Sequence, residues 1–377
     1  MNKVLFVSPT VYSNPLTKDI QKKFQSLSNV CNPIVYAFSE EKFSFSVEGV
    51  EAIFNKKNKN RFLNYLKIIF LFFFKIPKIV KDQNIDIVCL QDPITGFFTI
   101  FSLKIRKSPV KIAVETHGDF IDTIGLEKNL LIPKFYTSIF SYLAKYSIKK
   151  ADLIRSISDF TEKQVLNFGY QGLFVRFPAW INIDNYLNTD IQRSYSDTFK
   201  IIFVGSVTDR KNPKIIIESL ETIDVNVSLE IIGQTPNLKY LKELNNLISS
   251  SKHAERITMT PFIKAEELIS KYSSANLFIL PSKSEGLGRV VIEAQATACP
   301  VLVSSGTGIV DLIIESETGY IFDNNNREDL KEKIQNIIEN YDVAIQTGLN
   351  SRDFVKNNQS IENFEFGYRK LFDLVLA

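Results

Sequence analysis

Two glutamates, Glu285 and Glu293, flank the start of a predicted helix within 278–303 (FILPSKSEGLGRVVIEAQATACPVLV). The run Gly286-Leu287-Gly288 leads into that helix. Glycines at a helix N-terminus let a ligand approach backbone N–H groups, and the helix dipole favours phosphate or pyrophosphate there. A carboxylate can also accept hydrogen bonds from the vicinal hydroxyls of a ribose. The pattern predicts a phosphate cradle, with Glu285 near the reacting end of the ligand and Glu293 further along. The alternative is an ordinary glycine-initiated helix with two solvated glutamates.

The elements that must hold this cradle follow from the hydropathy pattern. We expect strands at 3–8, 33–38, 85–90, 111–116 and 152–157, and in a second series at 200–205, 227–232, 276–281 and 300–304. Continuous apolar strands separated by stretches long enough for crossover helices are typical of buried parallel sheets. The sequence therefore predicts an α/β protein of two Rossmann-like, doubly wound domains. Ligands of such sheets bind beyond the carboxyl ends of the strands, here in a cleft between the two domains.

Length and composition agree with two globular domains. The chain has 377 residues, of which 45% are hydrophobic and 23% charged, which excludes disordered and fibrous classes. The polar segment 188–199 lacks periodicity, and we place the domain boundary at 186–199. Three scattered cysteines exclude a disulfide framework and favour a reducing compartment, and two histidines argue against a histidine-rich metal site.

The net charge of +3 conceals an asymmetry. Residues 1–185 carry 25 Lys and Arg against 16 Asp and Glu, a net of +9, and residues 186–377 carry 20 against 26, a net of −6. Within the first half, the segment 55–81 holds eight basic residues, no acidic one and an apolar run from Ile68 to Phe74. That run is too short to span a bilayer, which needs about 20 apolar residues.

Basic residues around an apolar body suit a helix that lies on anionic lipid. We therefore expect 55–81 to make peripheral membrane contact, and the basic, aromatic stretch 130–150 favours the same interpretation. The alternative is a crossover helix, which an α/β protein needs between the strands 33–38 and 85–90, with its lysines simply solvated.

With these motifs together, the sequence resembles the retaining glycosyltransferases of family 4 (glycosyl transferases group 1), which have the GT-B fold. The hallmark is the pair Glu285 and Glu293 with seven residues between them, followed by Cys299-Pro300-Val301. Further matching elements are Thr307-Gly308-Ile309-Val310-Asp311, Thr318-Gly319-Tyr320-Ile321, 151–158, 178–186 and 262–272. The resemblance implies an acceptor-binding N-terminal domain, 1–185, and a donor-binding C-terminal domain, 186–361, with the final helix, 362–377, packing back on the first.

The resemblance also implies roles in donor binding. Where the family shows Gly-Arg-Leu-x-x-x-Lys-Gly after a strand, this chain has Gly205 and then Ser206, and Lys211 matches the family's lysine. Ser206 replaces the family's arginine, so we expect Arg210 or Arg289 to supply the second cation against the diphosphate. For Arg210 and Lys211 alone, a solvated loop pair is the alternative.

Backbone and cradle groups complete the expected donor site. By resemblance, the base is bound by backbone groups at 262–263 and around Gly233, which adds Ile263 to the site. The same resemblance assigns the donor diphosphate and ribose to Gly286, Leu287, Gly288 and Glu293.

In the first domain, His117 follows a predicted strand and matches a family histidine near the donor sugar. Asp119 is a candidate for orienting His117. The alternative is a structural histidine, which a lone histidine after a strand more often is. The family's glycine-rich loop after the first strand is absent, because residues 8–15 contain no glycine. We therefore expect an acceptor site built differently from the family's usual one.

The implied reaction transfers a hexose from a UDP- or GDP-sugar to a hydroxyl of a growing cell-envelope glycan, with retained anomeric configuration. Glu285, His117 and Lys211 would be catalytic, and displacement on the front face of an ion pair is favoured over a covalent intermediate. No Asp-x-Asp motif occurs, which favours catalysis without a metal or other cofactor. We expect the protein in the cytoplasm, at the inner face of the cell membrane, with no nucleic-acid partner.

Two other functions stay open. A nucleotide-sugar epimerase shares the two-domain fold, and transfer of label from the sugar nucleotide to an acceptor would distinguish the two enzymes. Ser206 and the missing glycine loop also allow a non-catalytic GT-B scaffold subunit, which would bind neither UDP nor GDP.

Overall fold

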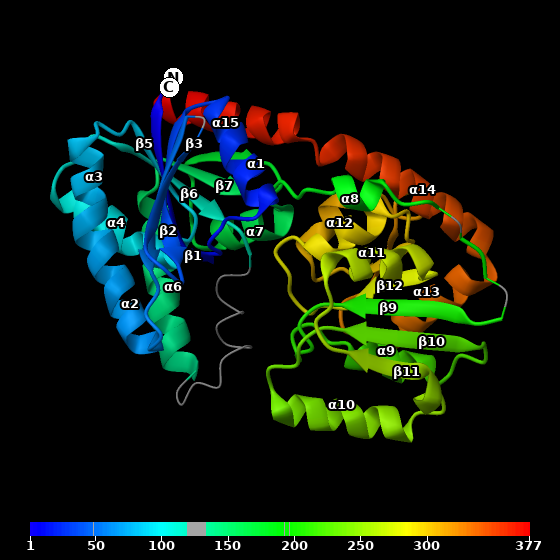
Figure 1. Ribbon diagram of the computed structural model, residues 1–377. Helices are drawn as coiled ribbons and strands as arrows, with labels where there is room; N and C mark the ends of the chain where they lie inside the picture. Colours follow the sequence, from blue (N-terminus) through cyan, green and yellow to red (C-terminus); the bar gives the residue numbers. More distant parts are fainter. Residues whose placement is uncertain (48, 119–132, 192, 196) are drawn as a thin grey trace. The chain divides into compact units, whose positions relative to one another are not determined.

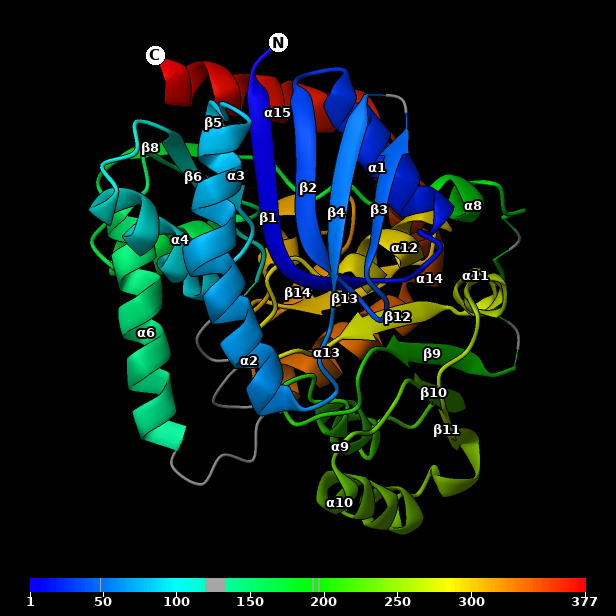
Figure 2. The ribbon, with the colours of Figure 1, turned by 60° about the vertical axis from the view of Figure 1, so that its left-hand side comes forward.

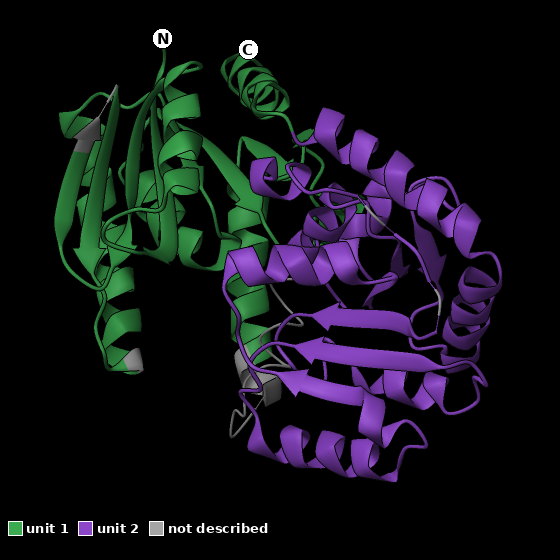
Figure 3. Ribbon diagram, turned by 45° about the vertical axis from the view of Figure 1, so that its right-hand side comes forward, with its two compact units in different colours: residues 1–180, 360–377 green, residues 181–359 purple. Residues whose placement is uncertain are grey.

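The computed structural model describes residues 1–47, 49–118, 133–191, 193–195 and 197–377. The chain divides into two compact units, each with its own sheet (Figure 3). Unit 1 comprises Met1–Trp180 and Ser360–Ala377, and unit 2 comprises Ile181–Gln359. The division thus falls at 180/181, a few residues before the 185/186 boundary expected from the sequence. The predicted fold class, two doubly wound α/β domains, is confirmed.

Unit 1 contains an eight-stranded sheet in the order β3-β4-β2-β1-β5-β6-β7-β8. All neighbouring strands are parallel except β3, which runs antiparallel to β4. The strands are β1 (Lys3–Tyr12), β2 (Asn32–Ser39), β3 (Phe43–Val47), β4 (Val50–Lys56), β5 (Ile87–Leu90), β6 (Lys111–Thr116), β7 (Leu153–Ser156) and β8 (Leu173–Arg176).

Helices cover both faces of this sheet (Figures 1 and 2). They are α1 (Lys18–Ser28), α2 (Arg61–Phe70), a π-helical turn (Leu71–Lys75), α3 (Ile76–Asp82), α4 (Pro93–Ile105), α6 (Pro133–Lys150), α7 (Asp159–Asn167) and α15 (Ile361–Leu376). One buried cluster joins the sheet to α1 and α15, through Phe24 and Tyr368 for example. A second cluster on the opposite face includes Phe72, Ile76 and Ile100. The central strands therefore bury both of their faces, which explains their continuous apolar runs.

The segment 55–81 contains the helical crossover between β4 and β5. Such a crossover helix was the alternative to a membrane-contacting helix in the interpretation of the sequence. The crossover is continuously helical from α2 through the π-helical turn to α3. A π-helical turn inserts a residue and leaves carbonyl groups to find other partners. Here the hydroxyls of Thr99 and Ser102 on α4 donate to the carbonyl oxygens of Phe72 and Phe73, which ties the turn to α4.

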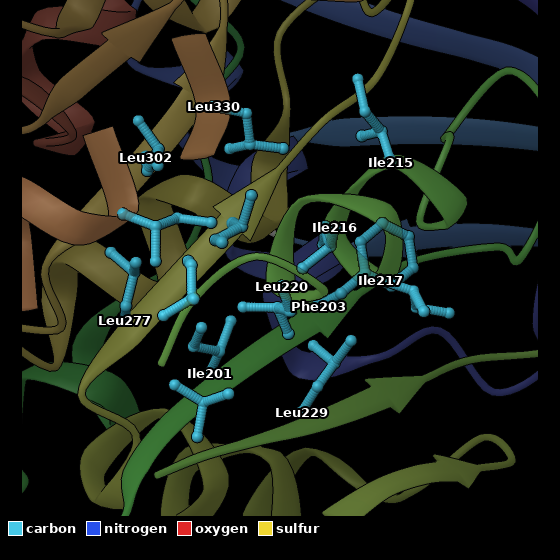
Figure 4. Packing of buried hydrophobic residues seen from close by; sticks show 14 of the residues in the cluster. Ile201, Phe203, Ile215, Ile216, Ile217, Leu220, Leu229, Leu277, Leu302 and Leu330 are labelled. Atoms are coloured by element: carbon cyan, nitrogen blue, oxygen red, sulfur yellow. The ribbon is translucent and has the colours of Figure 1, made fainter. Parts of the chain in front are cut away.

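Unit 2 contains a six-stranded parallel sheet in the order β11-β10-β9-β12-β13-β14. Its strands are β9 (Phe199–Val204), β10 (Val227–Ile232), β11 (Ile257–Thr260), β12 (Leu277–Leu280), β13 (Val301–Ser304) and β14 (Tyr320–Phe322). Its helices are α8 (Asp184–Leu187), α9 (Lys214–Leu220), α10 (Leu238–Ser250), α11 (Ala265–Ser274), α12 (Arg289–Ala296), α13 (Arg327–Glu339) and α14 (Tyr341–Asn358), with short 3₁₀ turns at Ala254–Arg256 and Gly308–Leu312. Figure 4 shows the core on one face of this sheet, where Phe203 and Leu229 of the strands pack against Ile216 of α9 and Leu330 of α13.

Candidate active site

The candidate residues of unit 2 lie in loops that leave the carboxyl ends of its parallel strands. Gly205 follows β9, Gly233 follows β10, and Ile263 lies in the loop after β11. The segment from Glu285 to Gly288 connects β12 to α12. Because all these strands are parallel, the loops leave the same edge of the sheet, the edge at which open α/β sheets bind ligands.

Two glycines let the first two of these loops approach each other. Gly233 has φ +147°, and a Cβ atom built on it would lie 1.9 Å from the carbonyl oxygen of Gly205. No side chain fits at that distance. The requirement for glycine at position 233 is therefore steric, and it holds the backbone after β10 directly against the backbone after β9.

Two cations converge on one carboxylate at this edge. Lys211 Nζ makes an ion pair with Glu285 Oε2, and Arg210 Nη1 lies 3.5 Å from the same oxygen. All three side chains are largely buried, with 12% exposure for each cation and 20% for Glu285. Arg210 also donates to the carbonyl oxygen of Ser284 at 2.7 Å, so the loop after β9 is tied to the loop after β12. Paired, partly buried cations of this kind are suited to binding a phosphate group.

The glycine-led helix start on which the cradle was predicted is present at α12, and its binding of phosphate stays a prediction. Gly288 adopts the left-handed conformation, with φ +82°, as the residue that precedes the helix, and Leu287 is buried. Gly286 and Leu287 come just before it, between Glu285 and the helix. Backbone N–H groups at the start of a helix point towards a ligand placed there, and the helix dipole favours an anion at that end.

Glu293 and Arg289 pair with each other, one turn apart on α12. Arg289 Nε donates to Glu293 Oε1 at 2.7 Å, and the hydroxyl of Tyr272 donates to Oε2 at 3.4 Å. Burial raises the pKa of the Glu293 carboxyl, and the charge of Arg289 opposes that shift. Of the two replacements considered for the cation missing at Ser206, Arg210 is thus the one that the structure brings beside Lys211.

His117 lies in unit 1, directly after β6, and is held by a buried carboxylate. Its Nε2 lies 2.9 Å from Oε2 of Glu115, which is itself fully buried. Glu115 also accepts a hydrogen bond from Arg155 Nη1 at 2.7 Å and one from the hydroxyl of Tyr368 at 3.0 Å. Because an ionised carboxylate only accepts, His117 carries a proton on Nε2, and in the neutral ring Nδ1 is the acceptor.

The electrostatics of this network keep Glu115 charged. Burial alone would raise the pKa of the Glu115 carboxyl, but the Arg155 guanidinium and the hydrogen bond with His117 outweigh it and lower the pKa to about 2. Burial lowers the pKa of the His117 imidazole, although the hydrogen bond with Glu115 opposes this shift. A neutral imidazole beside a carboxylate is thus the state at neutral pH, and it can accept or donate one proton.

Three residues of this network escaped the sequence analysis. Glu115 could have been found, because residues two apart at the end of a strand share a face. Arg155 stands at an internal position of the otherwise apolar strand β7, opposite Glu115 in the sheet register, which is a weaker signal. Tyr368 gave no signal. Asp119, proposed to orient His117, lies outside the described residues.

The segment after the first strand differs from the expectation. Strand β1 continues to Tyr12, with an irregular register against β2 between Val7 and Val11, so five of the eight residues 8–15 are extended strand. Within the described ranges no cluster of three His, Cys, Asp or Glu side chains could hold a metal ion. Metal independence stays a prediction.

Comparison with known families divides the chain between residues 184 and 187, a few residues after the division between the two units. Residues 31–184 match the model of Glycosyltransferase Family 4, and residues 187–358 match that of Glycosyl transferases group 1. An uncharacterized glycosyltransferase of Methanocaldococcus jannaschii is 29% identical over 234 residues, which cover 62% of each chain. A capsular polysaccharide biosynthesis glycosyltransferase of Staphylococcus aureus is 28% identical over 221 residues, covering 57% of this chain and 56% of the relative. The match thus spans less than two thirds of the length of these relatives.

Solved structures share the whole fold at low identity. Sucrose-phosphate synthase from Thermosynechococcus elongatus superimposes with a TM-score of 0.76 at 16% identity, covering 100% of this chain and 99% of that one. Anabaena HepE, solved in complex with UDP, gives a TM-score of 0.72 at 15% identity over 98% of this chain and 99% of its own. HepE has also been solved with UDP-glucose.

Proposed function

Because the chain belongs to glycosyltransferase family 4, with the group 1 module in unit 2, we propose that it transfers a hexose from a nucleoside diphosphate sugar to a hydroxyl group, with retained anomeric configuration. The observation that carries the proposal is the convergence of Lys211 and Arg210 on Glu285, beside the start of α12. The complexes of HepE with UDP and UDP-glucose support a uridine or similar diphosphate donor.

In this proposal the barrier is lowered chiefly by stabilising the departing diphosphate. Lys211, Arg210 and the N–H groups of 286–289 face the negative charge that develops on the leaving group. Such preorganised donors act most strongly where water is excluded, and the low exposure of both cations meets that condition. No metal is required for this step.

The two glutamates take different roles. Glu285 is the carboxylate beside the cations, and it is placed near the sugar. Glu293 is placed at the donor's ribose, with Arg289 as its partner. A retaining enzyme with a covalent intermediate needs a nucleophile and an acid about 5 Å apart on the sugar. Since only Glu285 is assigned to the sugar, displacement on the front face of an ion pair is favoured. By family resemblance, His117 is proposed to act near the donor sugar.

The acceptor is proposed to be a growing cell-envelope glycan, such as a polysaccharide, lipopolysaccharide or lipid-linked oligosaccharide. The capsular polysaccharide relative and mannosyltransferases that act on phosphatidylinositol mannoside support this class. Such acceptors are anchored in a membrane, and the basic segment 55–81 is proposed to bring the protein to its cytoplasmic face. No helix within the described ranges is long and apolar enough to cross a bilayer.

The test uses the purified chain with radiolabelled UDP- and GDP-hexoses and a lipid extract that contains glycan acceptors. We expect label in the lipid fraction from one nucleotide class, and NMR of the product should show the donor's anomeric configuration. Inverted configuration would contradict retention. Label that returns only as an isomerised sugar nucleotide would instead identify an epimerase.

A further inference from the structure

A continuous strip of aromatic rings crosses three helices of unit 1. Ring centroids lie 5.1 Å apart for Phe70 and Phe74, 4.8 Å for Phe74 and Phe73, and 6.3 Å for Phe73 and Phe101. Phe101 stacks on Phe97 at 5.5 Å, and Phe97 meets Tyr146 of α6 at 5.0 Å. We call these residues the aromatic strip: Phe70, Phe73, Phe74, Phe97, Phe101 and Tyr146.

The fold does not account for this strip. Ile68, Phe72 and Ile76 already supply the buried face of the crossover helix. On its other face Phe70 and Phe74 are 60% and 52% exposed. Phe62, Leu63 and Leu66 of α2 and Ile105 of α4 are exposed as well. A helix that is apolar on its solvent side as well as its core side normally has a partner on both.

A basic hollow of about 880 Å³ adjoins the strip, and Phe74 lines both. Its charged lining comprises the cations Lys78, Lys81, Arg106 and Lys107 and the carboxylates Asp82 and Asp86, a net of +2. Arg106 lies between the hollow and the strip. Its guanidinium is 5.5 Å from the centre of the Phe73 ring and donates a hydrogen bond to the carbonyl oxygen of Ser102. One carboxylate oxygen of Asp86 already accepts a hydrogen bond from the backbone N–H of Lys3, at 2.7 Å.

We propose that the aromatic strip lies in the interfacial layer of an anionic bilayer while the basic hollow binds the phosphodiester headgroup of one anionic phospholipid. Aromatic rings prefer the headgroup level of a membrane, and basic residues beside them are attracted to anionic lipid. An apolar surface beside a hollow of net positive charge matches an anionic phospholipid, because the surface can contact the acyl chains and the hollow can bind the phosphate. Nucleic acid would match the charge but not the exposed aliphatic residues beside the rings. This inference rests on the proposed membrane-anchored acceptor and adds the lipid class and the contact residues.

The test is sedimentation of the full chain with vesicles of phosphatidylglycerol and phosphatidylcholine, compared with phosphatidylcholine alone. The hollow variant Lys78→Gln/Lys81→Gln is compared with Lys57→Gln/Lys59→Gln, which removes two charges from the same basic segment outside the hollow. We expect the partition coefficient on anionic vesicles to fall at least tenfold further in the hollow variant than in the control pair. Equal losses would indicate diffuse attraction and overturn the headgroup site.

The strip is tested with Phe70→Ser/Phe74→Ser. In case that chain fails to fold, Phe62→Ser/Leu66→Ser tests two other exposed apolar side chains of α2. Each should lower vesicle binding at least tenfold. Unchanged binding, or a wild-type chain that stays in solution, would overturn the proposal, as would a strip variant that loses only self-association in gel filtration. Titration of UDP and GDP into the same variants keeps the two proposals apart, because donor binding in unit 2 should be unaffected by any of these changes.

Discussion

The hydroxyl of Tyr368 donates to the carboxylate of Glu115 across 3.0 Å and so joins the final helix, α15, to the end of strand β6. Glu115 in turn holds the imidazole of His117 at 2.9 Å. The last helix of the chain is therefore part of the support of the histidine, and Tyr368 is a positioning residue in the proposed mechanism.

Replacing Tyr368 by phenylalanine should remove that support. A hydrogen bond to a buried charged group is worth about 1.5–3 kcal/mol, and we expect a loss of unfolding free energy in this range from urea titration. Turnover should fall by roughly tenfold through misplacement of His117, with donor affinity unchanged. The control is Tyr142→Phe at an exposed position of α6, which should change stability by less than about 0.5 kcal/mol. If the Tyr368→Phe chain is destabilised but turns over at the wild-type rate, Tyr368 has only a structural role.

The same network predicts how stability depends on pH. The Glu115 pKa is about 2 in the folded chain, below its ordinary value near 4.5, so the unfolded chain binds a proton more readily. The stabilisation is complete above about pH 5 and is lost as pH falls towards 2. The pKa of His117 is also lowered from its ordinary value of 6.5, chiefly by burial, so the unfolded chain binds this proton more readily too. Folding stability therefore also decreases as the pH falls below about 6.5. Unfolding free energies of Glu115→Gln should therefore fall less steeply with acidification than those of wild type, whereas Glu339→Gln, on an exposed end of α13, should follow wild type. Parallel curves for Glu115→Gln and wild type would contradict the assignment.

Lys211→Ala should depress turnover. Loss of one preorganised charge on a leaving group costs about 10²–10³ in kcat. The control is Lys214→Ala, because Lys214 is a neighbouring, half-exposed lysine that pairs with Glu218 on α9. Steady-state rates with saturating donor measure the difference. Similar rates in the two variants would remove Lys211 from the catalytic machinery.

Glu293→Ala should weaken donor binding, by about tenfold if one hydrogen-bonded ribose contact is lost. Its partner Arg289 is 62% exposed, so water can solvate the freed guanidinium and the chain should still fold. Calorimetric titration of the donor measures the affinity, and a thermal melt confirms folding. Unaltered affinity would show that Glu293 has only a structural role, through its contacts with Arg289, Tyr272 and Tyr186.

Gly233→Ala tests the packing of the loops at the site. Its Cβ would lie 1.9 Å from the Gly205 carbonyl oxygen, so either the loop after β9 moves or the chain is destabilised by 1–3 kcal/mol. Gly118→Ala is the matched control for stability, since no atom of the described residues lies within 4 Å of a Cβ built there. Comparable melting temperatures for the two variants would contradict the close approach.

The sequence predicted most central strands of the two sheets because those strands are buried on both faces. It missed the internal strand β4, in which buried residues alternate with Glu51, Ile53 and Asn55. Strands at the sheet edges were missed for the converse reason. In β3, Phe43 and Phe45 alternate with serine, and in β8 Val175 is the one fully buried side chain. Strand β11 is also an edge, with a buried residue only at Ile257. Such strands have one neighbour and need fewer apolar residues.

The site divides in a similar way. Glu285, Lys211 and the glycines before α12 could be predicted, because they are close in sequence to strand ends and form motifs. That Arg210 and Lys211 both approach the carboxylate of Glu285 could not be predicted. This contact depends on two loops that are 74 residues apart in the sequence. The Tyr368 contact spans 253 residues, and no local pattern carries information over such a separation.

The central claim is that unit 2 binds a nucleoside diphosphate sugar through Lys211 and Arg210. Calorimetric titration of UDP and GDP into the full chain tests it most directly. We predict one site per chain for one of the two nucleotides, with affinity reduced at least tenfold in Arg210→Ala and unchanged in Lys214→Ala. Binding of neither nucleotide would contradict the account and favour a scaffold protein. Equal binding in the wild-type and Arg210→Ala chains would contradict the claim that Arg210 holds the nucleotide.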